Sequence, residues 1–154
     1  MNVEVLRDQL RQPGARVGVG VWLMPRDYFG REAAIAVRLN VQAVDARQAY
    51  LPSLPAGARF SGLTRPDGHQ HLTSMLRDLA HTIQQRDCLL VHTLDLLLLG
   101  LEVDERERFW REALEGIPYP RTKLILAVPE NAPELFSFEV QHRYVTQIAR
   151  GTLK

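Results

Sequence analysis

Four short, almost uninterrupted apolar runs alternate along this chain with segments of helical spacing, and this alternation restricts the possible folds most strongly. Continuous apolar runs are typical of strands covered on both faces, and strands separated by helices are typical of βαβ units. The crossover connections of such units are right-handed and place helices on the sheet. We therefore predict an α/β fold, a three-layer sandwich around a mainly parallel sheet of four or five strands. The predicted strands are Arg16–Met24, Val41–Val44, Cys88–Leu94 and Thr122–Val128.

The helical segments differ in how clearly the sequence marks them. The residues from Leu72 to Ile83 carry apolar side chains at the spacing of an amphipathic helix. Asp104, with Glu107 three positions later, forms a variant of the capping box and predicts the start of a further helix. The other predictions are a first helix over Val3–Arg11, an alanine-rich helix over Gly30–Leu39, a short helix near Pro133–Phe136 and a last strand or helix over Arg143–Ala149.

The length and composition fit one domain. The chain has 154 residues, of which 45% are hydrophobic and 24% charged, as in an ordinary globular protein. We predict a single domain over 1–154, with an N-terminal helix within 1–14. The segment 50–68 is rich in proline and glycine, so it is predicted to be an irregular loop, and a loop of that length tends to be functional or mobile.

The charge balance excludes a strong electrostatic attraction to nucleic acid or anionic lipid. Nineteen basic and eighteen acidic residues give a formal net charge of +1, so any contact with DNA is expected to be indirect or weak. The longest apolar stretch is interrupted by Asp95 and Glu102, so no membrane span is expected. A single cysteine, Cys88, fits a reducing compartment. We therefore predict a cytoplasmic protein without membrane contact.

The carboxyl ends of the predicted strands are the first place to look for a ligand site, because open parallel sheets bind ligands there. The third strand and its continuation read LLVHTLDLLL, which has the shape of the Walker B strand of P-loop ATPases. His92 stands where the Mg²⁺-binding acid would be, and imidazole is a poor ligand for that ion. Asp95 is either a displaced acid or, as we favour, the N-cap of a turn at Leu96–Leu99.

The segment after the first strand departs further from a nucleotide-binding loop. A P-loop has the pattern G-x-x-x-x-G-K-[ST], because backbone amides and a lysine must surround the phosphates. This chain has MPRDYFGREA instead, with Gly30, Arg31 and Glu32 in place of G-K-[ST]. A proline and two bulky aromatic residues in this segment are incompatible with a tight anion nest.

The order of these elements resembles a minimal P-loop NTPase core, with an A-type strand and loop over Arg16–Leu39 and a B-type strand over Cys88–Asp95. The chain most resembles the small P-loop-like accessory proteins of bacterial phage-defence operons, especially the BrxF and BrxB families of BREX systems. The resemblance implies a P-loop NTPase-like fold and contacts with other proteins of a defence complex. Because both nucleotide motifs are degraded, it implies an accessory or scaffolding subunit that has no cofactor and no catalysis of its own.

Two other functions stay open at this point. One is a nucleotide-binding protein or Mg²⁺-dependent phosphohydrolase, in which Asp95 and Asp45 would hold the ion and Arg31 the phosphate. The other is direct binding of DNA through an arginine face. The cofactor-binding residues of the first alternative would be Arg26, Asp27, Arg31, His92 and Asp95.

Histidine and cysteine residues suggest two weaker candidate sites. His69 and His71 are a candidate pair of metal ligands, with His81 or His92 as a third, but on a helix the first two would point to different sides. Cys88 opens a buried strand, where a small apolar filler is favoured over a nucleophile.

Three aspartates and several aromatic residues complete the candidates. Asp45, Asp87 and Asp95 would form a carboxylate cluster if they met at one sheet edge, although separate turn or cap roles are favoured. Trp22 and Trp110 are assigned to the core. The tail residues that are hardest to bury, and that would cover a sheet edge or form a partner surface, are Phe136, Phe138, Tyr144 and Val145.

Overall fold

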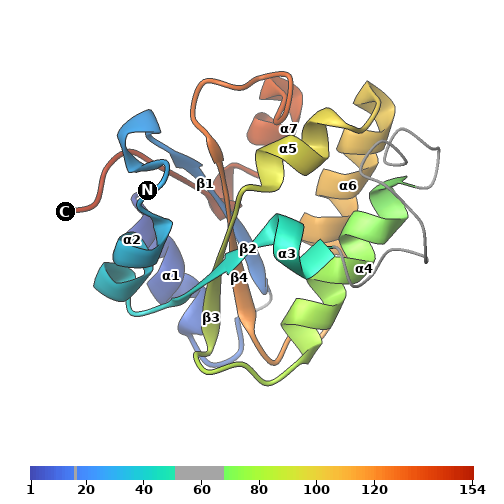
Figure 1. Ribbon diagram of the computed structural model, residues 1–154. Coiled ribbons are helices and arrows are strands. Elements are labelled where there is room, and N and C mark those ends of the chain that lie inside the picture. The colour runs from blue at the N-terminus through green and yellow to red at the C-terminus, as the bar shows by residue number, and fades with distance from the viewer. Residues whose placement is uncertain (16, 51–67) are drawn as a thin grey trace.

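A computed structural model of the protein describes residues 1–15, 17–50 and 68–154. Its centre is a five-stranded sheet in the order β2-β3-β4-β1-β5, in which every neighbouring pair of strands is parallel (Figure 1). The prediction of an α/β fold around a parallel sheet is confirmed. The strands are β1 (Val19–Met24), β2 (Gln42–Asp45), β3 (Cys88–His92), β4 (Lys123–Pro129) and β5 (Ile148–Arg150).

The helices cover the two faces of the sheet unequally (Figure 1). The connection from β1 to β2 runs along the sheet in one direction, and the connections that follow β2, β3 and β4 run in the other. Right-handed crossovers then place the first connection on one face and the other three on the opposite face. One face carries α1 (Val3–Arg11) and α2 (Glu32–Leu39), and the other carries α3 (Ala46–Tyr50), α4 (Gly68–His81), α5 (Leu94–Leu99), α6 (Val103–Glu115) and α7 (Phe138–Arg143).

Each face of the sheet has its own apolar core. On the α3–α7 face, the Trp110 ring packs against Phe136 at a centroid distance of 4.5 Å, and its indole N–H donates to the Leu135 carbonyl at 2.7 Å. On the α1–α2 face, Trp22 is fully buried with Leu6 and Cys88. A Cβ at Gly20 would lie 2.7 Å from a Leu6 methyl carbon, so α1 packs directly over the glycine of β1. Both tryptophans are core residues, as predicted.

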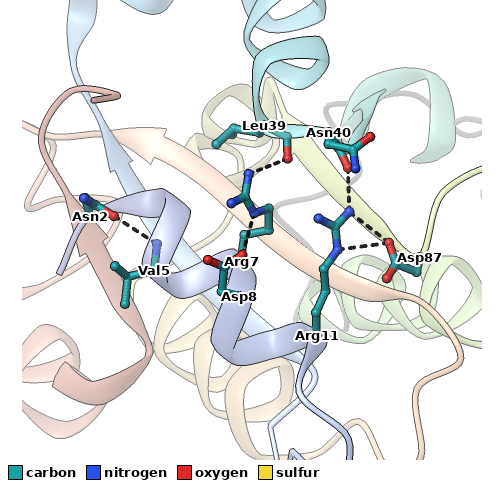
Figure 2. A network of polar contacts seen from close by, with 8 residues as sticks. All are labelled: Asn2, Val5, Arg7, Asp8, Arg11, Leu39, Asn40 and Asp87. Atoms are coloured by element: carbon teal, nitrogen blue, oxygen red, sulfur yellow. Dashed lines mark hydrogen bonds and ion pairs between the residues drawn. The ribbon is translucent and has the colours of Figure 1, made fainter.

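Arginines of α1 hold the carboxyl end of α2 in place (Figure 2). The guanidinium of Arg7 donates to the Leu39 carbonyl at 2.8 Å, and that of Arg11 donates to the Asn40 carbonyl. Asn40 ends α2 in the left-handed conformation, with φ 57°. Cations near exposed carbonyls at a helix C-terminus are stabilising. These arginines therefore serve the fold, and neither belongs to the predicted site.

Two predicted helix ends are wrong. The α4 helix ends at His81, so Ile83 lies beyond it and is 78% exposed instead of on the buried face. The α6 helix has Glu102 at its N-cap, so Asp104 lies in the first turn and does not cap it. An acidic residue in the first turn still interacts favourably with the helix dipole.

The segments after β3 and β4 also differ from their predictions. β3 ends at His92, two residues earlier than predicted. The predicted short helix near Pro133–Phe136 is a turn, and α7 begins after Ser137, whose hydroxyl accepts a hydrogen bond from the Val140 amide. Of the four tail residues singled out above, Phe136 and Tyr144 are buried in the core, and Phe138 and Val145 are exposed.

The predicted irregular loop over 50–68 lies almost entirely outside the described residues; Tyr50 ends α3 and Gly68 begins α4. Among the helices that the structure describes, none has the length and apolar character needed to cross a membrane.

Candidate functional site

A crevice lies at the carboxyl ends of β1, β3 and β4. It forms because the chain leaves β1 toward one face of the sheet and leaves β3 and β4 toward the other, which is the arrangement that opens ligand crevices in parallel sheets. Two adjoining hollows, of about 180 and about 250 Å³, occupy this position. Both are lined by Met24, Phe29, Asp95 and Pro129. We call the two hollows together the edge groove.

The loop that follows β1 is closed by its own hydrogen bonds. The amides of Tyr28, Phe29 and Arg31 each donate to the carbonyl oxygen three residues earlier, at 3.0–3.1 Å. The amide of Gly30 donates to Oε1 of Glu32 at 3.1 Å. Four consecutive amides are thus bonded within the protein. In a phosphate-binding loop such amides point at the anion, so this loop has none of these four to offer.

Glu32 takes the position that an anion would occupy at the start of α2. Arg31 is the N-cap residue, and its side chain makes no capping hydrogen bond. The Glu32 carboxylate lies in the first turn and bonds back to the Gly30 amide instead. Gly30 has φ 84°, a conformation that favours glycine. A side-chain carboxylate therefore already compensates the positive end of this helix dipole.

The C-terminal residues Gly151 and Leu153 hold the same loop in place through contacts with Trp22 and Tyr28. The Tyr28 ring packs on Trp22 at a centroid distance of 5.7 Å, and its hydroxyl accepts a hydrogen bond from the Leu153 amide at 3.0 Å. The Trp22 indole donates to the Gly151 carbonyl at 3.0 Å. These contacts fix the conformation in which the loop amides are occupied.

Of the five predicted site residues, the structure brings two together. Arg26 and Asp95 line the same hollow. Asp27 and Arg31 are exposed on the loop and do not line the edge groove. His92 ends β3 and lines neither hollow; its Nδ1 lies 2.7 Å from the hydroxyl oxygen of Thr93.

The carboxylate cluster of Asp45, Asp87 and Asp95 does not form. Asp87 precedes β3, at the end of the sheet opposite Asp95, and its carboxylate pairs with Arg11 at 2.9 Å (Figure 2). The Asp45 carboxylate accepts a hydrogen bond from the Arg47 amide, as in an ordinary turn. Asp87 and Asp95 lie at opposite ends of β3, so these two carboxylates cannot bind one ion.

The sequence alone did not single out several acidic and apolar residues of the groove lining. Glu134 and Leu99 come from segments with no recognisable motif, and Glu130 directly follows β4. Together with Glu32 and Asp95 there are four carboxylates in the lining, against one guanidinium, that of Arg26. The side chains of Asp95, Glu130 and Glu134 make no hydrogen bond or ion pair with any other described residue. The lining of the edge groove is therefore mainly acidic, and three of its four acids have no described partner.

Thr93 lies at one end of the groove in an uncommon conformation. It is the N-cap residue of α5 and has φ 63°, which is rare for a β-branched residue. The prediction that Asp95 is the N-cap is therefore wrong, and Asp95 lies in the first turn. Such backbone outliers cost free energy and cluster at binding sites. Thr93 lines the smaller hollow, so the outlier coincides with the edge groove.

The histidine pair does not come together as metal ligands. His69 is buried between α4 and α6, with Nδ1 against the Glu105 carboxylate and Nε2 3.3 Å from the Glu112 carboxylate. His81 Nε2 contacts the Pro118 carbonyl at 2.9 Å. Among the residues that the structure describes, no group of three or more His, Cys, Asp or Glu residues is arranged to hold a metal ion.

Cys88 is a buried thiol in the smaller core. Burial raises the pKa of Cys88 to about 12, and the nearby Arg11 opposes that shift only in part. The thiol is therefore protonated at neutral pH and is not poised as a nucleophile.

No family model, curated protein or solved structure matched this chain when each was searched. The function is therefore inferred from the chemistry of the site itself.

Proposed function

We propose that this protein is a non-catalytic accessory or scaffolding subunit of a multi-protein assembly, which keeps a nucleotide-binding type of architecture and uses it for protein contacts. The observation that carries the proposal is the closed loop after β1. Four consecutive amides of that loop are bonded internally, one of them to Glu32. A phosphate chain would have to displace all four bonds.

The sheet supports a relationship to P-loop proteins. Read from β5, the strand order is 5-1-4-3-2, which resembles P-loop NTPases in which one strand separates the A-type strand from the B-type strand. β1 would be the A-type strand and β3 the B-type strand, with β4 between them. We propose that the chain derives from such a core by loss of the phosphate-binding loop.

The charges at the groove disfavour a nucleotide or DNA backbone. Arg26 is the single cation in a lining that carries four carboxylates. Like charges at short distance are strongly unfavourable where solvent is partly excluded. The phosphohydrolase alternative needs Asp95 and Asp45 on one ion, but Asp45 lines neither hollow and its carboxylate accepts a hydrogen bond from the Arg47 amide.

For the assembly itself we propose a bacterial phage-defence complex of the BREX type, in the cytoplasm, with the other proteins of that complex as partners. This part rests on the resemblance of the two strand-and-loop segments to small P-loop-like defence proteins. Contact with DNA would be made by the partners.

Thermal unfolding in the presence of ATP, ADP or GTP with Mg²⁺ tests the proposal. A nucleotide at a hundredfold excess over its dissociation constant would stabilise the protein by about 2.7 kcal/mol and raise Tm by about 5 °C or more. We expect no rise. A rise that is abolished by Asp95→Ala, and kept by Asp78→Ala on the exposed face of α4, would overturn the proposal in favour of nucleotide binding.

A further inference from the structure

We infer that the edge groove is the docking site for a linear segment of a partner protein, in which a lysine or arginine stands next to apolar side chains. The inference rests on the proposed function and specifies the surface and the chemistry of the partner. It follows from the size of the groove, the apolar side chains along it and the charge of its lining.

The edge groove is divided into two hollows, each of which is smaller than a usual small-molecule pocket. Small-molecule pockets usually measure about 300–1,000 Å³. The two hollows measure about 180 and about 250 Å³ and adjoin through their shared lining. Two neighbouring hollows of this size can each take one side chain from the same face of a segment, two residues apart if it is extended or three to four apart if it is helical.

Apolar side chains stand exposed at the groove. Phe29 is 39% exposed on the β1 side, and Leu99 is 53% exposed on the opposite side. Exposed apolar side chains that gather beside a hollow, with polar residues at the rim, mark interaction surfaces.

The charge of the lining decides the chemistry of the occupant. The Glu32 carboxylate is bonded to the Gly30 amide, while those of Asp95, Glu130 and Glu134 have no described partner. A cationic side chain of the partner would compensate these three acids, whereas an acidic peptide or a phosphate backbone would be repelled. The apolar side chains then supply the area to be buried, and the acids select for a basic residue.

The groove is also held in the shape described. Tyr28, next to Phe29, is fixed by Trp22 and by the Leu153 amide. A preformed surface loses little conformational entropy on binding. A linear segment would therefore meet Phe29 already in place.

Selection from a display library of random linear peptides against the full-length protein tests the inference. We expect the enriched peptides to place lysine or arginine next to leucine, isoleucine or phenylalanine. The dissociation constant of an enriched synthetic peptide should rise about tenfold or more when Asp95→Lys and Glu134→Lys are combined, because the attraction becomes repulsion. Leu99→Ser should weaken the same peptide by a similar factor of about ten, since a half-exposed leucine at the centre of an interface loses its contact.

Matched variants distinguish the groove from general surface effects. Asp78→Lys reverses an exposed acid on α4, and Ile83→Ser removes an exposed aliphatic side chain beyond α4; both should leave the peptide affinity unchanged. Enrichment of no peptide, enrichment of acidic peptides, or equal weakening by the groove and control variants would each overturn the inference. None of these results would alter the outcome of the nucleotide experiment, so the two proposals fail separately.

Discussion

Two sets of acidic side chains in this protein differ in how their charge is compensated. Between α4 and α6, the carboxylates of Glu105 and Glu112 face the two ring nitrogens of His69. In the edge groove, Asp95 and Glu134 have no ion pair or side-chain hydrogen bond with any described residue. The first set is satisfied within the fold and joins two helices. The second set lines the edge groove without such a partner, as the proposed docking surface requires.

The largest expected effect on the free energy of unfolding comes from removing a carboxylate that contacts His69. Glu105→Ala removes one of the two carboxylates that face the buried His69 and should lower the free energy of unfolding by about 3 kcal/mol. This is the low end for a buried pair that loses one member, because Glu112 still faces Nε2. Urea unfolding at neutral pH measures the loss.

Two further variants make this prediction specific to the buried pair. Glu115 lies on α6, like Glu105, and forms an exposed ion pair with Arg143 of α7. Glu115→Ala should therefore lower the free energy of unfolding by less than about 1 kcal/mol. The double variant His69→Leu/Glu105→Leu removes both partners and should lose less than Glu105→Ala alone. A loss no greater for Glu105→Ala than for Glu115→Ala would mean that the pair does not hold α4 to α6.

An intermediate effect concerns the buried thiol of Cys88 and depends on pH. Burial raises its pKa to about 12 in the folded protein, whereas in the unfolded chain the thiol titrates near its ordinary value. The folded state therefore keeps a proton that the unfolded state loses. The stabilising contribution is complete below about pH 8.5 and falls as pH rises toward 12, by about 1.4 kcal/mol for each pH unit.

Comparison with Cys88→Ala isolates that contribution, because all other titrating groups are shared. The difference in the free energy of unfolding between the wild-type protein and Cys88→Ala should shrink by about 2 kcal/mol between pH 7.5 and pH 10. A difference that stays constant over this interval would show that burial does not raise the pKa of the Cys88 thiol.

The smallest expected effect on stability belongs to the groove. Asp95→Asn combined with Glu134→Gln should change the free energy of unfolding by less than about 0.5 kcal/mol, because neither carboxylate has a partner to lose. The loss of mutual repulsion should be offset by the loss of the favourable interaction of Asp95 with the first turn of α5, and both terms should shrink with added salt. If the same urea unfolding showed that the free energy of unfolding falls by more than 1 kcal/mol, these acids would stabilise the fold, as Glu105 and Glu112 do.

The sequence predicted the features that depend on local periodicity. The four predicted strands and the helices α1, α2, α4 and α6 follow from apolar runs and helical spacing, and the carboxyl edge follows from the parallel topology. The short helices α3 and α7 were not predicted, and α5 was predicted only as a turn. Ile83 and Asp104 were misplaced because the helix ends depend on packing as well as on local pattern.

The candidate site was predictable only in part. Arg26 and Asp95 were recognised because they follow strands, and they do line one hollow. Glu134 and Leu99 were not recognised, because the groove is assembled from three segments that are separate in the sequence, those that follow β1, β3 and β4. The pairing of His69 with Glu105, 36 positions apart, likewise depends on how α4 packs on α6, which no spacing rule contains.

The central claim is that the amides of the loop after β1 are occupied within the protein and are closed to phosphate. The backbone amide signals of Tyr28, Phe29, Gly30 and Arg31 in a ¹H–¹⁵N spectrum test it most directly. Titration with Mg²⁺–ATP should leave all four unshifted, whereas Glu32→Gln should shift that of Gly30. A saturable movement of these four signals on addition of the nucleotide would contradict the account.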